Sequence, residues 1–408
     1  MKFFRSSRPG NKGRINHALL LPRLPLVLLF SAYMKIGFAG RWDPQDKSSW
    51  SGTYYYTYQQ LKKKHDVSIF LFRWTWLVRE QLMLRRQFHK RLQGKHTSVE
   101  FLKSYATFFS RQLENELKKN KVDLLYAPAA PQLIAYLKTQ APIIFMTDAT
   151  FKQIQGYYDS WQNIAPSNIR EGIEVDSHAF HNAAHSLVAS DWCRQSAISD
   201  YGIDPNKISV APLGANLDLP PAKAIEKQNT GICQLLFLGV EWERKGGPIA
   251  LETFRELRRM GLNAHLHIIG CRPPIELSDK NITVIPYLDK NKPAEQAQLV
   301  SVLQQTHFLL LPTRAECAGV VFCEAAAYGI PSISTATGGV PTYVRDGING
   351  YALPYHSTGA AYAETLASLF SDFGKYQALS HSSRKLYEEE LNWDRWGERF
   401  MDAAKKVV

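Results

Sequence analysis

The sequence is poor in cysteine, and none of its cysteines stands in a Cys-x-x-Cys pair. Zinc sites and disulfide frameworks rely on closely spaced cysteines, so neither is expected here. An odd number of scattered thiols fits a reducing compartment best, and we therefore expect a cytoplasmic protein without a metal site. The five are Cys193, Cys233, Cys271, Cys317 and Cys323.

Acidic residues are also in deficit. The chain has 37 Asp and Glu against 49 Lys and Arg, which gives a net charge of +12. Such an excess favours anionic partners: nucleic acid, acidic lipid or phosphorylated substrates. Nucleic-acid binding would require a recognisable module in addition to charge, and the sequence contains none, so we expect no nucleic-acid partner.

Long apolar runs are missing too. The run from Leu24 to Tyr33 follows a basic stretch and has the outline of a signal peptide, but it is too short to cross a bilayer as a helix. Met34 then opens a strand-like segment. Residues 1–33 are therefore either a leader or an extension upstream of the true start at Met34, and we favour the second interpretation.

The remaining composition is that of a globular protein, with 45% hydrophobic and 21% charged residues. A chain of 408 residues is too long for one ordinary core, so we expect two domains. Short apolar runs alternate with longer amphipathic segments, a pattern typical of βαβ units and parallel sheets. In the first half the expected strands lie near Ile36, Val67 to Leu71, Leu124 to Tyr126, Ile143 to Met146, Leu187 to Ala189 and Ile208 to Val210, with a helix over Val99 to Lys119.

The alternation restarts after a polar, proline-containing linker at residues 219–231. Strands are expected at Leu235 to Leu238, Leu266 to Ile269, Ile282 to Ile285, Phe308 to Leu311, Ser332 to Ser334 and Tyr351 to Leu353, with a helix from Gly247 to Arg259. We therefore predict two α/β domains, at residues 34–218 and 232–391, and a C-terminal packing helix over 392–408. Ligands of such sheets bind beyond the carboxyl ends of the strands, which places the site in the cleft between the domains.

Residues 312–331 carry the most specific pattern. A buried strand ends before Glu316, a small loop follows, and a helix begins near Gly319 with Glu324 further inside it. Free amides at a helix start bind phosphate, and ionised carboxylates accept hydrogen bonds from sugar and ribose hydroxyls. The amides concerned are those of Gly319, Val320 and Val321.

This segment resembles the Glu-x7-Glu signature of retaining glycosyltransferases of family 4. Residues 335–351 also resemble the Gly-Gly-hydrophobic-Pro segment of that family. The resemblance implies the GT-B fold, with two Rossmann-like doubly wound domains and a nucleotide-sugar donor held by the second. It further implies that Glu316 contacts the donor sugar and that Glu324 holds the ribose.

A second element follows the linker. A strand ends at Gly239, and Arg244 and Lys245 precede the next helix. Two cations here would neutralise a diphosphate leaving group without a metal ion. The alternative is a solvated helix cap. The family commonly has an arginine directly after the strand glycine, whereas this chain has Val240, so Arg244 beside Lys245 would supply the charge from another position.

The first half shows its site only in outline. Gly52 lies before a tyrosine-rich helix, where it either lets the backbone approach a ligand or forms a plain turn. Asp148 follows a predicted strand and faces the same cleft. Relatives often carry a histidine near this position that contacts the donor sugar, and Asp148 takes its place in this chain. The alternative for Asp148 is a helix cap.

Residues 74–95 combine Trp74 and Trp76 with several cations, a composition suited either to an anionic membrane surface or to a solvated face. The cations are Arg79, Arg85, Arg86, Lys90, Arg91 and Lys95.

We predict a metal-independent retaining transfer of a hexose, from a UDP- or GDP-sugar and without a further cofactor, to a glycan or a lipid-linked acceptor. A nucleotide-sugar epimerase of the same fold and an inactive sugar-nucleotide binding module are the alternatives.

Overall fold

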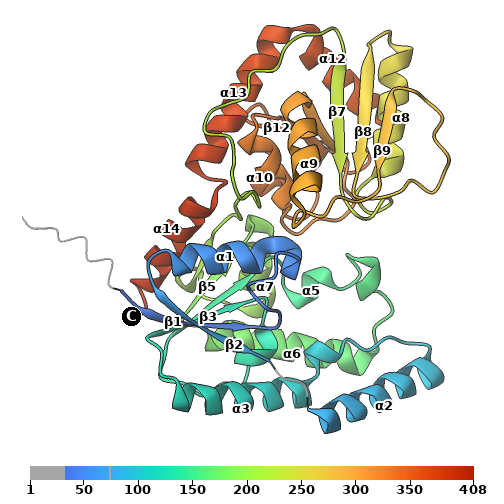
Figure 1. The fold of residues 1–408 in the computed structure, drawn as a ribbon. Helices are drawn as coiled ribbons and strands as arrows, with labels where there is room; N and C mark the ends of the chain where they lie inside the picture. The colour runs from blue at the N-terminus through green and yellow to red at the C-terminus, as the bar shows by residue number, and fades with distance from the viewer. Residues whose placement is uncertain (1–32, 73–74) are drawn as a thin grey trace, which may run out of the picture. The chain divides into compact units, whose positions relative to one another are not determined.

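The computed structural model of the chain describes residues 33–72 and 75–408 (Figure 1). The leader or upstream extension predicted for residues 1–33 falls, apart from Tyr33, outside the described residues and stays a prediction. Residues Met34–Val408 form one compact unit.

The first half of this unit is built on a parallel sheet of six strands, and each of the six predicted strands is present. The order is β2-β1-β3-β4-β5-β6, so the chain reverses its direction of travel across the sheet between β1 and β3. Such a reversal is the hallmark of a doubly wound fold. The strands are β1 Lys35–Gly40, β2 Asp66–Leu71, β3 Leu124–Pro128, β4 Ile143–Thr147, β5 His185–Val188 and β6 Ile208–Val210.

The second half repeats the plan, and its six predicted strands are confirmed as well. The order is β12-β11-β10-β7-β8-β9, again all parallel. Because β7 pairs with β10 at the point of reversal, the loops that follow these two strands lie side by side. The strands are β7 Cys233–Leu238, β8 Ala264–Ile269, β9 Ile282–Ile285, β10 Phe308–Leu311, β11 Ser332–Thr335 and β12 Gly350–Leu353.

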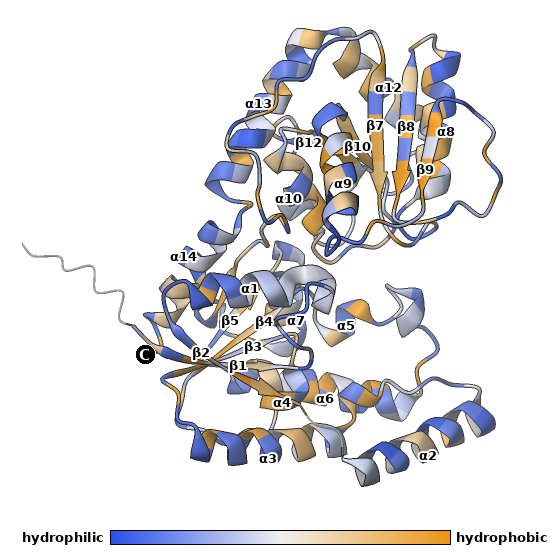
Figure 2. Cartoon of the chain, viewed as in Figure 1, coloured by the Kyte–Doolittle hydropathy of each residue, from blue (hydrophilic) through white to orange (hydrophobic). Residues whose placement is uncertain are grey.

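Helices connect the strands, and the longer surface helices bury one face. Along α3 the buried residues Tyr105, Phe109, Leu113 and Leu117 recur at helical spacing, and Figure 2 shows the matching alternation of hydrophobic and hydrophilic colours. The helices are α1 Thr53–Lys62, α2 Trp76–Gln93, α3 Lys103–Lys119, α4 Pro131–Ile134, α5 Phe151–Ile154, α6 Pro166–Asn182, α7 Asp191–Tyr201, α8 Gly247–Arg259, α9 Pro293–Gln305, α10 Val320–Ala327, α11 Val340–Tyr343, α12 Gly359–Ser371, α13 Phe373–Glu389 and α14 Trp393–Ala404, with 3-10 turns η1 Ser49–Gly52, η2 Val99–Phe101, η3 Asp159–Trp161 and η4 Pro205–Lys207.

One helix prediction needs a correction. The single helix expected from Val99 to Lys119 is divided into η2 and α3, because Leu102 between them is extended, with φ −81° and ψ 132°. Leu102 is fully buried, and this burial outweighs the continuous helical pattern of the segment.

The C-terminal helix α14 packs on the first sheet domain, although it follows the second one along the chain. Trp393 stacks on Tyr56 of α1 with 6.0 Å between the ring centroids, and Trp396 and Phe400 pack against Tyr126 of β3. The packing helix predicted for this segment is confirmed. Its docking on the first half ties the last residues of the chain to the beginning of the fold.

Candidate active site

A cleft of about 1080 Å³ lies where the carboxyl ends of both sheets meet. This volume is at the upper end of the range of small-molecule sites. Its walls contain all ten residues predicted for the site, together with several that the sequence did not indicate. From the predicted set these are Gly52, Asp148, Gly239, Arg244, Lys245, Glu316, Gly319, Val320, Val321 and Glu324; the others include Lys47, Trp50, Tyr56, Tyr158, Asn216, Asp218 and Lys290.

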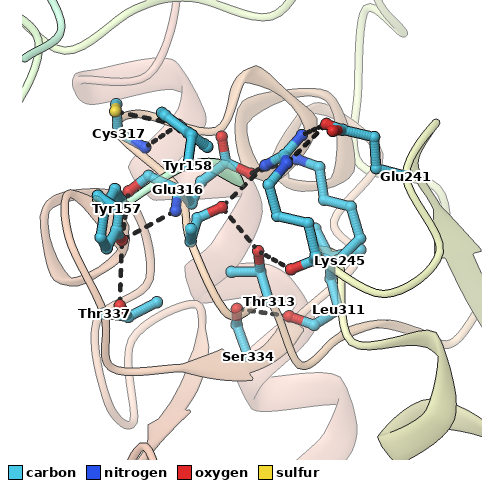
Figure 3. A network of polar contacts seen from close by, with 12 residues as sticks. Tyr157, Tyr158, Glu241, Lys245, Leu311, Thr313, Glu316, Cys317, Ser334 and Thr337 are labelled. Atoms are coloured by element: carbon cyan, nitrogen blue, oxygen red, sulfur yellow. Dashed lines mark hydrogen bonds and ion pairs between the residues drawn. The ribbon is translucent and has the colours of Figure 1, made fainter. Parts of the chain in front are cut away.

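The carboxylate of Glu316 forms an ion pair with the ammonium group of Lys245 (Figure 3). The side chains are 11% and 12% exposed, so water screens this pair only weakly. Glu316 follows β10 and Lys245 follows β7, and the pairing of these two strands explains why residues 71 positions apart meet. Opposite charges at the mouth of a cleft suit a ligand that carries both hydroxyls and phosphate.

Arg244 lies beside the same pair. One of its guanidinium nitrogens is 3.9 Å from the Glu316 carboxylate and donates to the carbonyl oxygen of Ala315 at 2.8 Å. Burial opposes the charge of the guanidinium, but the hydrogen bond to Glu241 and the charge of Glu316 outweigh it and raise the pKa of Arg244. Arg244 is only 18% exposed, which argues against the solvated-cap alternative.

Glu324 lies deeper in the cleft, on the fifth residue of α10, and its side chain is 5% exposed. One of its carboxylate oxygens accepts a hydrogen bond of 2.5 Å from Lys290, which lies between β9 and α9. A carboxylate has two oxygens, each of which can accept a hydrogen bond from a ligand hydroxyl. Helix α10 begins directly after Gly319. This residue has a φ of +96°, a left-handed conformation that favours glycine.

Asp148 follows β4 and faces this cleft from the first half. Burial, reinforced by the negative charge of Glu316, raises the pKa of Asp148 to about 6, against hydrogen bonds from its own amide, Trp50 and Ala149 that lower it. The carboxyl group is therefore mainly ionised above pH 6 and takes up a proton below it. The cap of the next helix, α5, is Thr150, so the capping role considered for Asp148 is wrong.

Gly52 lies at the end of an unusual turn before α1. Trp50, Ser51 and Gly52 all have positive φ angles, of 47°, 54° and 90°. A left-handed conformation costs on the order of 1 to 3 kcal/mol for a non-glycine residue, and such strain is concentrated at functional sites. A Cβ atom on Gly52 would come within 2.7 Å of the Asn216 amide nitrogen, so this glycine allows close packing against the segment that connects the two halves.

The other glycines of the motifs allow close approach between loops. A Cβ atom on Gly239 would come within 2.8 Å of the Lys245 side chain. Atoms on Gly338 and Gly339 would meet the carbonyl oxygens of Glu316 and Cys317 at 2.3 and 1.9 Å. The Gly-Gly segment therefore lets the loop after β11 press directly on the loop that carries Glu316.

Several residues of the site were not predictable from the sequence. Tyr157 and Tyr158 bind the backbone of the Glu316 loop, Lys290 binds Glu324, and Asn216 bridges the Ser51 carbonyl oxygen and the Trp393 indole. None of them belongs to a motif with fixed spacing. One local signal could have indicated Tyr157 and Tyr158: they follow shortly after the strand that ends near Asp148, a residue predicted to face the cleft.

The basic segment predicted at residues 74–95 forms helix α2 over most of its length. Trp74 and the side chain of Arg85 lie outside the described part of the chain. Among the side chains of α2 that the structure describes, large apolar ones are exposed at Trp76, Met83, Leu84 and Phe88, by 72%, 44%, 66% and 55%. Over the described ranges, 33–72 and 75–408, no helix is both long and apolar enough to cross a membrane.

The five cysteines are all free and buried. Burial, reinforced by neighbouring carboxylates, raises the pKa of the Cys317 thiol beside Glu316 well above its usual value, so it is a neutral packing group. In the part of the chain that the structure describes, no three His, Cys, Asp or Glu side chains are grouped so as to hold a metal ion.

Two doubly wound sheets with ionisable groups gathered at their facing ends define a GT-B glycosyltransferase fold. The family model described as "Glycosyltransferase Family 4" matches residues 53–219, and the one described as "Glycosyl transferases group 1" matches residues 233–372. The chain therefore belongs to the glycosyltransferases of GT-B type, in agreement with the family 4 resemblance of its Glu-x7-Glu segment.

Individual proteins resemble the chain at low identity. A D-inositol 3-phosphate glycosyltransferase of Xylanimonas cellulosilytica is 26% identical over 60% of this chain and 63% of its own length. Matches to such enzymes thus span between 44% and 63% of the relatives' length. Spore coat protein SA of Bacillus subtilis is 23% identical over 85% of this chain and 91% of its own.

Solved structures share the fold over nearly the whole chain. A lipopolysaccharide outer core galactosyltransferase has a TM-score of 0.62 and 15% identity, with coverage of 92% of this chain and 100% of that one. The HepE protein of Anabaena, in complex with UDP-glucose, has a TM-score of 0.59 and 12% identity with the same coverage. At these identities the likeness establishes the fold alone.

Proposed function

We propose that this protein is a metal-independent retaining hexosyltransferase that uses a UDP- or GDP-sugar donor. The observation that carries the proposal is the arrangement of charges in the cleft. Glu316, Lys245, Arg244 and Asp148 line it together with the N-terminus of α10, which begins beside Glu316, and Glu324 lies one turn further along that helix. A nucleotide sugar has a matching order of groups: sugar hydroxyls, diphosphate and ribose.

In this proposal the donor lies along α10. The amides of Gly319, Val320 and Val321 take the phosphate, because the start of a helix offers free N–H groups. Glu324 accepts hydrogen bonds from the ribose hydroxyls through its carboxylate oxygens. Structures of the Anabaena protein of similar fold with UDP and with UDP-glucose support a nucleotide sugar as the ligand.

The chemistry follows from the same placement. As the bond from the anomeric carbon to the diphosphate breaks, its electron pair leaves with the diphosphate, and Lys245 and Arg244 offset the charge that develops. The acceptor hydroxyl bonds to the anomeric carbon from the same face, and its proton passes to the departing phosphate oxygen. Glu316 and Asp148 hold the sugar hydroxyls and stabilise positive charge on the ring. No separate protein nucleophile is required.

The acceptor is proposed to be a glycan or a lipid-linked molecule, reached from the cytoplasmic side of a membrane. Helix α2 supports a peripheral contact, because exposed Trp76, Leu84 and Phe88 share it with exposed Arg86, Lys90 and Arg91. Aromatic and apolar side chains favour the lipid interface, and cations are drawn to an anionic surface.

The membrane contact predicts that the protein co-sediments with vesicles that contain phosphatidylserine, and that binding falls at high salt. Each cation near an anionic surface contributes about 1 kcal/mol, so replacing Arg86, Lys90 and Arg91 by Gln should weaken binding on the order of 100-fold. The same number of charges removed from α3, at Arg111, Lys118 and Lys119, is the control and should change binding little. Equal binding of both variants would contradict a contact through α2.

The activity itself is tested with a panel of UDP-, GDP- and ADP-hexoses and analysis of the products. We expect one donor to be consumed with release of the nucleoside diphosphate and transfer of the sugar with retained anomeric configuration. Interconversion of the nucleotide sugar without release would favour the epimerase alternative. Binding without turnover for every donor and acceptor would favour the inactive binding module.

A further inference from the structure

Two backbone amides of the loop that carries Glu316 are bound by tyrosine hydroxyls from the other half of the fold. The Glu316 amide donates to the Tyr157 hydroxyl at 2.9 Å, and the Cys317 amide donates to the Tyr158 hydroxyl at 3.1 Å. Both tyrosines lie in the turn between α5 and η3 of the first half, whereas the loop joins β10 to α10 of the second. The two rings meet edge-on with 5.4 Å between their centroids, and Figure 3 shows Tyr157 and Tyr158 next to this loop.

The contacts of Tyr157 extend to the neighbouring loop of the second half. Its hydroxyl lies 3.0 Å from the Thr337 hydroxyl, and the Glu316 carbonyl oxygen accepts from the Gly339 amide at 2.9 Å. A Cβ atom on Gly338 would come within 2.3 Å of the Tyr157 hydroxyl. The peptide groups on both sides of Glu316 are thus held, and the glycine after Thr337 leaves the room that the tyrosine needs.

Tyr158 holds the next residue of the same loop, Cys317. Its hydroxyl donates to the Cys317 sulfur at 3.0 Å, and its ring faces the Arg244 guanidinium at 5.2 Å. Tyr158 also lines the cleft. Burial, together with the nearby Cys317 and Glu316 groups, raises the pKa of Tyr158 far above its usual value. The hydroxyl therefore stays neutral and keeps the proton that it donates to the Cys317 sulfur.

We infer that Tyr157 and Tyr158 are positioning residues for the reaction, and that they act by fixing the backbone of Glu316 and Cys317. The inference rests on the proposed role of Glu316 at the donor sugar. The loop between β10 and α10 has no regular structure of its own to satisfy these amides. Without the two hydroxyls the peptide groups would turn to other partners, and the Glu316 carboxylate would lose its fixed place beside Lys245.

Kinetics separate this role from general stabilisation. Tyr157→Phe and Tyr158→Phe keep the rings and remove the hydroxyls, and each should lower kcat roughly 10-fold, as the loss of one buried hydrogen bond implies. The affinity for the nucleoside diphosphate should stay within about twofold, because the hydrogen bonds of the two hydroxyls go to Glu316, Cys317 and Thr337 rather than to the groups proposed to bind the nucleotide. Tyr136→Phe, which removes a hydroxyl bonded to Glu174 on the far side of the first half, is the control and should leave kcat unchanged.

A double-mutant cycle with Glu316→Gln tests whether the tyrosines act through Glu316. In the Glu316→Gln background the two Tyr→Phe changes should have little further effect on kcat. Hydrogen–deuterium exchange of peptides covering residues 312–319 supplies a readout that needs no donor, and exchange should quicken in both Tyr→Phe variants but not in Tyr136→Phe.

The outcomes distinguish two failures. If Glu316→Gln loses turnover while both Tyr→Phe variants keep wild-type kcat and exchange, the positioning role is overturned and the proposed function stands. If Glu316→Gln keeps wild-type turnover, the proposed function of Glu316 fails and the positioning role falls with it. Lower kcat with unchanged nucleotide affinity, coupling in the cycle and faster exchange together support the inference.

Discussion

We expect the Lys245→Met variant to lose turnover by on the order of 100- to 1000-fold, the effect of removing one group that stabilises charge in a transition state. Lys245 is 12% exposed and lies against Glu316, so its charge is screened little and acts at short range on a diphosphate in the cleft. Single-turnover consumption of the nucleotide sugar measures the chemical step directly.

Two controls accompany this variant. Lys280→Met removes an exposed cation just before β9, outside the residues that line the cleft, and should leave turnover unchanged. Because Lys245→Met leaves Glu316 poorly exposed and without its main partner, thermal unfolding should be measured in parallel to separate lost stability from lost chemistry.

Turnover of the wild type should survive a chelator, because Lys245 and Arg244 are proposed to offset the charge of the leaving group without a metal ion. Strict dependence on magnesium or manganese would contradict this assignment.

The second large effect is expected at Glu324. Glu324→Ala should weaken binding of the nucleoside diphosphate by about 1.5 to 3 kcal/mol, or roughly 10- to 150-fold, the range for a lost hydrogen bond to a charged group. Calorimetric titration with UDP or GDP, according to the donor found, measures this change. Glu256→Ala, on an exposed ion pair of α8 with Arg259, is the matched control and should bind normally.

The ligand offers a sharper version of the same test. A 2′,3′-dideoxy nucleoside diphosphate lacks the hydroxyls that Glu324 is proposed to hold, so it should bind weakly to the wild type and no more weakly to Glu324→Ala. Lys290→Met separates the ion pair from the ribose contact, because it keeps the carboxylate and removes its cation. Full affinity of Glu324→Ala for the normal nucleotide would show that the ribose lies elsewhere.

The strands were predictable because their signal is local. Each strand of a buried parallel sheet is a short apolar run, such as Phe308–Leu311, bounded by polar residues, proline or glycine, and it can be recognised without knowledge of its neighbours. The boundary error at Leu102 has a non-local cause, since burial against other elements overrode a continuous helical pattern there.

The spacing of Glu316 and Glu324, the paired cations at 244 and 245, and the order of strands and helices were all determined by the sequence alone, because each depends on residues close together in the chain. The tertiary structure decided which of these groups meet. Lys245 reaches Glu316 because β7 pairs with β10, Lys290 of the loop between β9 and α9 reaches Glu324 of α10, and two tyrosines of the first half bind amides of the second. Such contacts join positions from 34 to 159 residues apart, and no local periodicity or propensity encodes a pairing of that kind.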